Sequence, residues 1–188
     1  MTPRVVVAVL SVSIGSLLLG CSNDRVDDAA PSPTSKSAAT KAVELDGSSP
    51  PPWPAPTDVA ARVASAGLDL GPMGTAEHYH PHLRIIINGN EVAVPANIGV
   101  HPATGAMSAL HTHETDGTIH IEADRAGEVF TLGQLFVQWG VQLTPTQIGG
   151  MHAKDGQKVT VTSNGALVAG DPRNLRLQPD QKIELQLQ

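Results

Sequence analysis

The chain is poor in cysteine and in aromatic residues, which excludes an internal disulfide and a core built mainly from aromatic side chains. One cysteine among 188 residues rules out a disulfide within a single copy of the chain. Aromatic residues account for 3%, so a folded core has to rest mainly on valine, isoleucine and leucine. Basic residues are too few to balance the acidic ones, and the formal net charge of −6 argues against a nucleic-acid partner.

Several catalytic motifs are also missing. The sequence has no GxSxG, no CxxC, no P-loop and no dinucleotide fingerprint. His113-Glu114 does not continue to the second histidine that an HExxH motif needs. Gly105, His111 and His113 fit the opening of a cupin metal motif, but Glu114 comes too soon and Glu122 too late for the glutamate of that motif. The sequence therefore offers no nucleophile with a matching base.

The beginning of the chain has the pattern of an export signal. Arg4 precedes an apolar run over residues 5–19, which at about fifteen residues is short for a membrane span of about 20. The run ends in Leu18-Leu19-Gly20-Cys21, which resembles the lipobox of bacterial lipoproteins. This resemblance implies that residues 1–20 are a lipoprotein signal peptide. Cys21 then becomes the lipidated N-terminus, acylated for example with palmitate, and anchors the protein at the extracytoplasmic face of the cell membrane. The alternative is a secreted protein with an unpaired thiol.

Residues 21–56 are rich in serine, alanine, threonine and proline and offer little to bury. Their composition predicts a disordered tether, with an extended polyproline II stretch over residues 50–56. Residues 57–77 follow as a short helix and a loop, in which Thr57-Asp58 begins the helix and Gly67 lies near its end.

Residues 78–188 have the pattern of a folded α+β domain. Beta-hairpins are indicated by apolar alternation around Asn88-Gly89 and Asn164-Gly165. Residues 130–140 predict one well-capped helix, with Thr131 and Gln134 as a capping box and Gly140 at its end. Thr144-Pro145 indicates another short helix start. The closing segment, residues 177–183, loosely resembles the end of a β-grasp domain.

The stretch with the most chemistry begins at His111. Asp116-Gly117 is a signal for a two-residue hairpin turn, and β-favouring residues flank it. With such a turn, His113 lies opposite His120 and His111 lies opposite Glu122. Cross-strand partners share a face, with Cβ atoms about 4.5–5.5 Å apart. These three imidazoles and one carboxylate are therefore predicted to form a metal site.

Two isoleucines support that arrangement, because Ile119 and Ile121 alternate with the site residues and point toward a core. The alternative is a hydrogen-bonded polar face without metal. The prediction depends on the register, since a shift of one residue would place the four side chains on opposite faces.

A second histidine run precedes the first hairpin. Pro81 favours an extended backbone at the preceding residue, so His78, His80 and His82 are predicted to point the same way. At least one of them is a candidate metal ligand. His101 and His152 are interpreted as bystanders.

A group of small exported bacterial and archaeal proteins resembles the chain over roughly residues 78–140. They share a histidine-rich segment before an HTH…GxIHxE hairpin. The matching segments are His80-Pro81-His82-Leu83, Ile87-Asn88-Gly89, Pro95-Ala96-Asn97-Ile98-Gly99, His111-Thr112-His113, Gly117-Thr118-Ile119-His120-Ile121-Glu122 and Thr131-Leu132-Gly133-Gln134. The resemblance implies a shared site and no particular reaction.

The sequence favours a membrane-anchored extracytoplasmic lipoprotein that captures, buffers or delivers a transition metal. Imidazole ligands suit copper, zinc, nickel and iron, and copper(II) binds most tightly in general. Met73, Met107 and Met151 lie near histidines in the sequence, and thioethers favour copper(I). Copper is therefore the first expectation and zinc the second. The expected partners are the membrane, through the N-terminal lipid, the metal ion, and a protein that donates or accepts the metal.

Two other functions remain open at this point. A metal-dependent enzyme would use the same histidines with Glu114 or Glu122 as a base. An envelope interaction module without metal would use them as a pH-sensitive polar surface.

Overall fold

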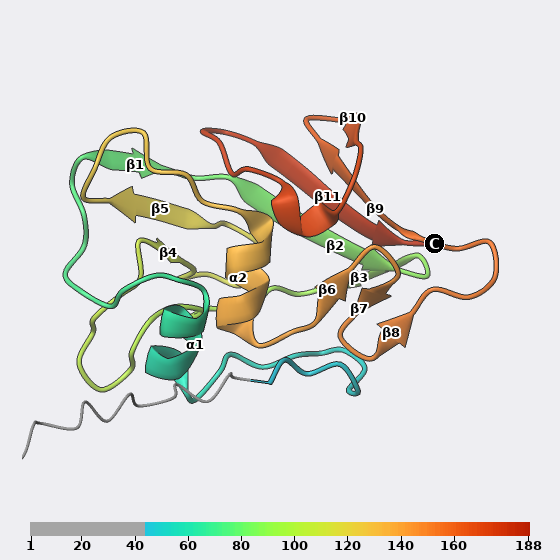
Figure 1. Cartoon of the computed structure of the whole chain (residues 1–188), viewed down its shortest axis with the longest axis horizontal. Coiled ribbons are helices and arrows are strands. Elements are labelled where there is room, and N and C mark those ends of the chain that lie inside the picture. The colour runs from blue at the N-terminus through green and yellow to red at the C-terminus, as the bar shows by residue number, and fades with distance from the viewer. Residues whose placement is uncertain (1–43) are drawn as a thin grey trace, which may run out of the picture. The chain divides into compact units, whose positions relative to one another are not determined.

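Figure 1 shows the computed structural model, which describes residues 44–188. The signal peptide, Cys21 and residues 21–43 of the predicted tether lie outside the described residues. The described residues group into one compact unit. No helix within residues 44–188 combines the length and the apolar character that crossing a membrane requires.

The described residues form an α+β domain, as predicted. It contains two α-helices, one short 3-10 helix and eleven strands. In chain order these are α1 Val59–Ser65, β1 Glu77–Tyr79, β2 His82–Ile87, β3 Asn90–Val92, β4 Leu110–His111, β5 His120–Ala123, α2 Leu132–Trp139, β6 Leu143–Thr144, β7 Gln147–Ile148, β8 Met151–His152, β9 Val159–Ser163, β10 Ala166–Val168, the 3-10 helix Pro172–Asn174 and β11 Lys182–Leu187.

The largest sheet has the strand order β10-β9-β11-β2-β3. At the centre of this sheet, β2 and β11 lie parallel to each other. Leu83 lies beside Ile183, and Ile85 lies beside Leu185. Each strand of this central pair has an antiparallel neighbour on its outer side: β3, which forms a hairpin with β2, and β9, which pairs with β11 and forms a hairpin with β10 (Figure 1). Such a parallel central pair between two hairpins is the arrangement expected of a β-grasp-like domain.

Alternation along the central strands builds the core. Alternate residues of β2 and β11 are buried on one face, because successive strand side chains point to opposite sides. Helix α2 adds its apolar stripe to the same core: Leu132, Leu135, Phe136 and Trp139.

Helix α2 has the predicted ends. The Thr131 hydroxyl accepts a hydrogen bond from the Gln134 amide, and the Gln134 side chain accepts one from the Thr131 amide, so both halves of the capping box are present. Gly140 ends the helix in the left-handed conformation. The helix predicted at Thr144-Pro145 is wrong. Thr144 belongs to β6, and its hydroxyl accepts a hydrogen bond from the Thr146 amide in a tight turn.

Helix α1 is confirmed, but its predicted cap is not. The Asp58 side chain makes no capping hydrogen bond and instead accepts one from Arg62 at 2.6 Å. Asp58 and Arg62 therefore form an ion pair across one turn of the helix.

The predicted tether is wrong for residues 44–56. Trp53 is 3% exposed and lies edge-on against Trp139, with ring centroids 5.9 Å apart. Its indole nitrogen donates to the carbonyl of Ser49, and the Asp46 amide donates to the carbonyl of Gly140. The segment is ordered although its composition is polar and rich in proline, because burial of Trp53 stabilises the folded state. Burying a large apolar side chain contributes roughly 1.5–3 kcal/mol.

Candidate metal centre

The three-stranded sheet β1-β5-β4 carries the site. In the observed register Leu110 lies opposite Ile121 and His111 lies opposite His120. The predicted pairing of His113 with His120 and of His111 with Glu122 is therefore wrong by two residues. Because side chains alternate with a period of two, a shift of two residues keeps the same residues on the same face. The histidines still converge although the register differs.

The register differs because the hairpin residues have another partner. The Leu83 amide donates to the carbonyl of Gly117, and the Ile119 amide donates to the carbonyl of Pro81, both within 2.9 Å. These bonds draw residues 117–119 toward the start of β2 and open a loop over residues 112–119. Asp116 accepts a hydrogen bond from the Thr118 amide inside this loop instead of forming the predicted two-residue turn.

Thr112 fixes the two histidines on either side of it. Its amide donates to the carbonyl of Ile98, and its hydroxyl donates to the carbonyl of Pro95 at 2.8 Å. Thr112 itself is completely buried. With Thr112 held on one side of the strand, His111 and His113 are directed to the other side.

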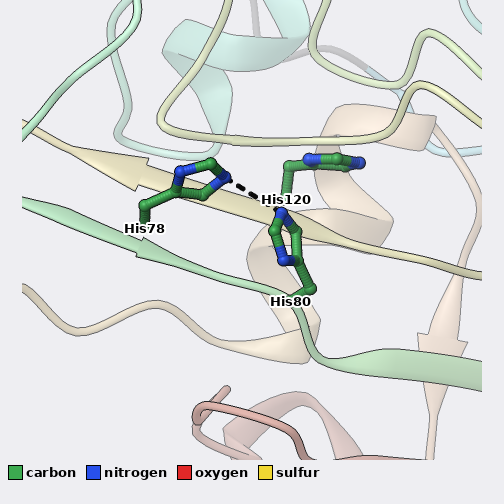
Figure 2. Close-up of side chains that lie close together, drawn as sticks. All are labelled: His78, His80 and His120. Carbon is green, nitrogen blue, oxygen red and sulfur yellow. Dashed lines mark hydrogen bonds between the residues drawn. The ribbon is translucent and has the colours of Figure 1, made fainter.

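Strand β1 brings the second histidine run to the same face. His78 lies opposite Glu122 in the antiparallel pairing of β1 with β5. His80 continues the alternation two residues further on. Figure 2 shows His78 and His80 close to His120, and the Nε2 atoms of His78 and His80 lie 3.0 Å apart.

Five of the eight histidines thus form a continuous group of rings. His120 occupies its centre, with ring centroids 4.6 Å from His80, 4.8 Å from His113 and 5.4 Å from His111. Two sets of three nitrogens lie within 4.8 Å of one another: an outer trio of His78, His80 and His120, and an inner trio of His111, His113 and His120. The outer trio is mostly exposed, whereas the inner trio contains the fully buried His111.

The separations suit a metal ion. The Nε2 atoms of His111 and His113 are 3.0 Å apart, as are those of His78 and His80. Two nitrogens bound to one tetrahedral zinc ion at about 2.0–2.1 Å would lie roughly 3.3 Å apart. Each pair therefore needs only a small outward movement to bind one ion.

Two carboxylates accompany the rings. Glu122 is 5% exposed, with Oε1 3.3 Å from Nε2 of His78 and Oε2 3.8 Å from Nε2 of His111. Among the described residues, Oε2 of Glu122 is one of two buried side-chain atoms that have no hydrogen-bond partner. Glu114 lies at the surface and contacts Nε2 of His120 at 2.9 Å. A buried oxygen without a partner is costly, and a cation between it and the rings would satisfy it.

His111 is held ready to bind a cation. Its Nδ1 lies 2.8 Å from the carbonyl of Ser108, which can only accept, so Nδ1 carries the ring proton and Nε2 keeps its lone pair toward the site. Burial lowers the pKa of His111 to about 4; the bond to Ser108 opposes this shift, and charge on His113 and His120 adds to it. Burial, followed by charge on His120 and His78, also lowers the pKa of His80. Both imidazoles therefore favour the neutral form that binds metals.

Three predicted or considered histidines lie elsewhere. His82 was a candidate ligand, but it begins β2 beside Lys182, and its side chain is not in either trio. His82 is separated from His78 and His80 because the chain leaves β1 at Tyr79 and enters the larger sheet at β2. His101 bonds to Thr104 within its own loop, and exposed His152 lies in β8.

Sequence reasoning missed two features of the centre. Glu114 was considered as a base and not as a partner of His120, because in the predicted register it lies opposite Ile119, on the other face of the hairpin. The pairing of β1 with β5 was also missed, because the two strands are more than forty residues apart and no sequence motif indicates that they pair. Two of the three methionines considered, Met73 and Met107, line a pocket of about 330 Å³ that Glu122 also borders.

No protein-family model matches the chain, and comparisons with curated proteins and with solved structures give no significant match. The chemistry of the site therefore has to be inferred from its own residues. Five imidazoles and a buried carboxylate on one face could hold a transition-metal ion of unknown identity.

Proposed function

We propose that the protein is a membrane-anchored extracytoplasmic lipoprotein that binds a transition-metal ion for capture, buffering or delivery. The observation that carries the proposal is the group of five histidine rings around His120, with the buried carboxylate of Glu122 beside His78 and His111. Copper is the favoured ion, because copper(II) leads in affinity for imidazole sites of this kind, and zinc is the second choice.

The geometry supports retention of an ion. His111 has its lone pair fixed by the bond to Ser108, and the carboxylate of Glu122 supplies negative charge next to His78 of one trio and His111 of the other. A fixed ligand loses little freedom on binding, so the orientation of His111 favours binding of the ion.

The test is a calorimetric titration of copper(II) and zinc(II) into the full chain, purified without a histidine tag. The native chain should bind one ion, and His120→Ala should weaken binding by more than the roughly 10–100-fold that loss of an outer-shell partner costs. His152→Ala is the matched control and should bind as the native chain does. If His120→Ala binds both metals as tightly as the control, the histidine group is only a polar face.

The anchoring part of the proposal is supported by the lipobox pattern at Leu18-Leu19-Gly20-Cys21. Cys21→Ser should release the protein from the membrane, because Cys21 is the only cysteine in the sequence and the variant has no thiol to carry a lipid. Fractionation after a carbonate wash measures this. A variant that stays in the membrane fraction would contradict a lipid-only anchor.

A further inference from the structure

The two trios share one residue, and this sharing limits how they can be filled. His120 belongs both to the outer trio with His78 and His80 and to the inner trio with His111 and His113. A neutral imidazole has one ring nitrogen with a free lone pair, whereas the other carries the proton. His120 can therefore bind an ion of the inner trio or of the outer trio, but not both, unless the ring loses its last proton.

The two positions differ in access. His78 and His80 are both exposed, so an ion bound to them can be reached by a ligand from outside. His111 has no exposed surface, and an ion bound to it lies deeper. The outer position is thus suited to exchange and the inner position to retention.

Glu122 lies between the two positions. Its Oε1 is 3.3 Å from His78 of the outer trio, and its Oε2 is 3.8 Å from His111 of the inner trio. Each carboxylate oxygen therefore faces one trio. An ion that moves from one trio to the other therefore stays close to the same negative charge.

We propose that the outer and inner trios are two alternative positions for a single transition-metal ion, which enters and leaves through the outer trio and is retained in the inner one. The proposal rests on the proposed metal-binding function. In the transfer, the bonds from the ion to His78 and His80 break and bonds to His111 and His113 form, while His120 stays bound. The charge of the ion does not change, and the His120 ring keeps one proton throughout.

The first measurement is stoichiometry at neutral pH, by calorimetric titration of zinc(II) into the full chain. We expect one ion in the native chain, in His78→Asn with His80→Asn, and in His113→Asn, because each variant leaves one trio intact. His113 is chosen over the buried His111 since its exposed side chain can change without opening a cavity. Tight binding of two ions by the native chain would overturn the proposal.

The second measurement is the rate at which zinc passes from the loaded protein to an excess of a coloured chelator. Loss of the outer trio in His78→Asn with His80→Asn should slow release by about tenfold or more, because the exposed position is gone; His113→Asn should speed it by a similar factor. His82→Asn is the matched control, since His82 comes from the same histidine run but lies outside both trios.

The two proposals fail differently. If the native chain binds no metal, the proposed function is wrong. If it binds one ion but the His78 and His80 double variant releases zinc at the rate of His82→Asn, the ion does not use the outer trio and only the transfer proposal is wrong.

Discussion

At the scale of single residues, the centre depends on groups that are fixed before any ion arrives. Nδ1 of His111 is committed to the carbonyl of Ser108, and Thr112 is bonded to the segment that contains Pro95 and Ile98. The remaining lone pair of His111 has one direction available. Binding therefore requires little rearrangement of the inner trio, which is what distinguishes a preorganised site from a chance cluster of surface histidines.

The buried His111 should make the metal-free protein sensitive to acid. Its pKa of about 4 in the folded state lies below the reference histidine value of about 6.5. The unfolded chain therefore takes up a proton first as the pH falls. The contribution to stability is complete above pH 6.5 and is lost progressively down to about pH 4, by about 3 kcal/mol in total.

Urea unfolding in the presence of a chelator, at pH 7 and at pH 5, would measure this loss. His111→Gln removes the titrating group and should show a smaller difference between the two pH values. His152→Gln, on an exposed strand, should keep the full difference. Equal acid sensitivity in both variants would mean that His111 is not the group responsible.

At the scale of elements, the local features were predictable and the non-local ones were not. The capping box of α2 and the burial of Ile119 and Ile121 follow from residues within one turn or one strand, and the structure confirms both. The register of β4 with β5 was wrong because residues 117–119 bond to the chain around Leu83, more than thirty residues earlier. A turn signal in the sequence cannot reveal such a competing partner.

The candidate site survived this error for a physical reason. An even shift in register preserves the face on which each side chain lies, so His111, His120 and Glu122 remain together. His82 was lost from the predicted set because it follows Pro81, where the chain passes from β1 into the larger sheet. The pattern of alternating histidines did not show that the strand ends there.

Gly117 should be essential to the conformation of the loop over residues 112–119, which carries His113 and Glu114. Its φ is +94°, its carbonyl accepts from the Leu83 amide, and an added Cβ would overlap the Leu83 carbonyl oxygen. Gly117→Ala should therefore displace the loop of residues 112–119. We expect lower stability, by more than the roughly 1 kcal/mol that positive φ costs an alanine, together with weaker zinc binding.

Gly165→Ala is the matched control for this prediction. Gly165 also has a positive φ, of +81°, but an added Cβ would meet nothing within 4 Å. Thermal melting and zinc titration of both variants separate the two effects. If Gly165→Ala weakens zinc binding as much as Gly117→Ala, the contact with β2 does not position the site.

At the scale of the whole molecule, the folded unit begins earlier than its composition indicates. Trp53 joins the same buried cluster as α2 and the central strands, and residues 44–56 make backbone bonds to residues that follow α2. The average composition of this segment is dominated by proline and serine, so it predicts disorder and does not reflect the burial of Trp53. One large side chain is enough to attach the segment.

Trp53→Ala should consequently lower the melting temperature. Removing a buried tryptophan costs about 3–5 kcal/mol, which corresponds to a fall of roughly 10–20 °C for a domain of this size. Pro50→Ala, at an exposed position of the same segment, is the control and should melt within about 2 °C of the native protein. A Trp53→Ala protein that melts like this control would show that the segment is dispensable for the fold.

The central position of β11 has a consequence for how the protein is made. Leu83 pairs with Ile183, and β9 also depends on β11 for its pairing with the rest of the sheet. During synthesis from the N-terminus, β2 waits for about a hundred further residues before its parallel neighbour exists. A nascent chain therefore cannot close its main sheet until β11 has left the ribosome. If the first twenty residues direct export as proposed, the chain can reach the secretion machinery while its main sheet is still incomplete.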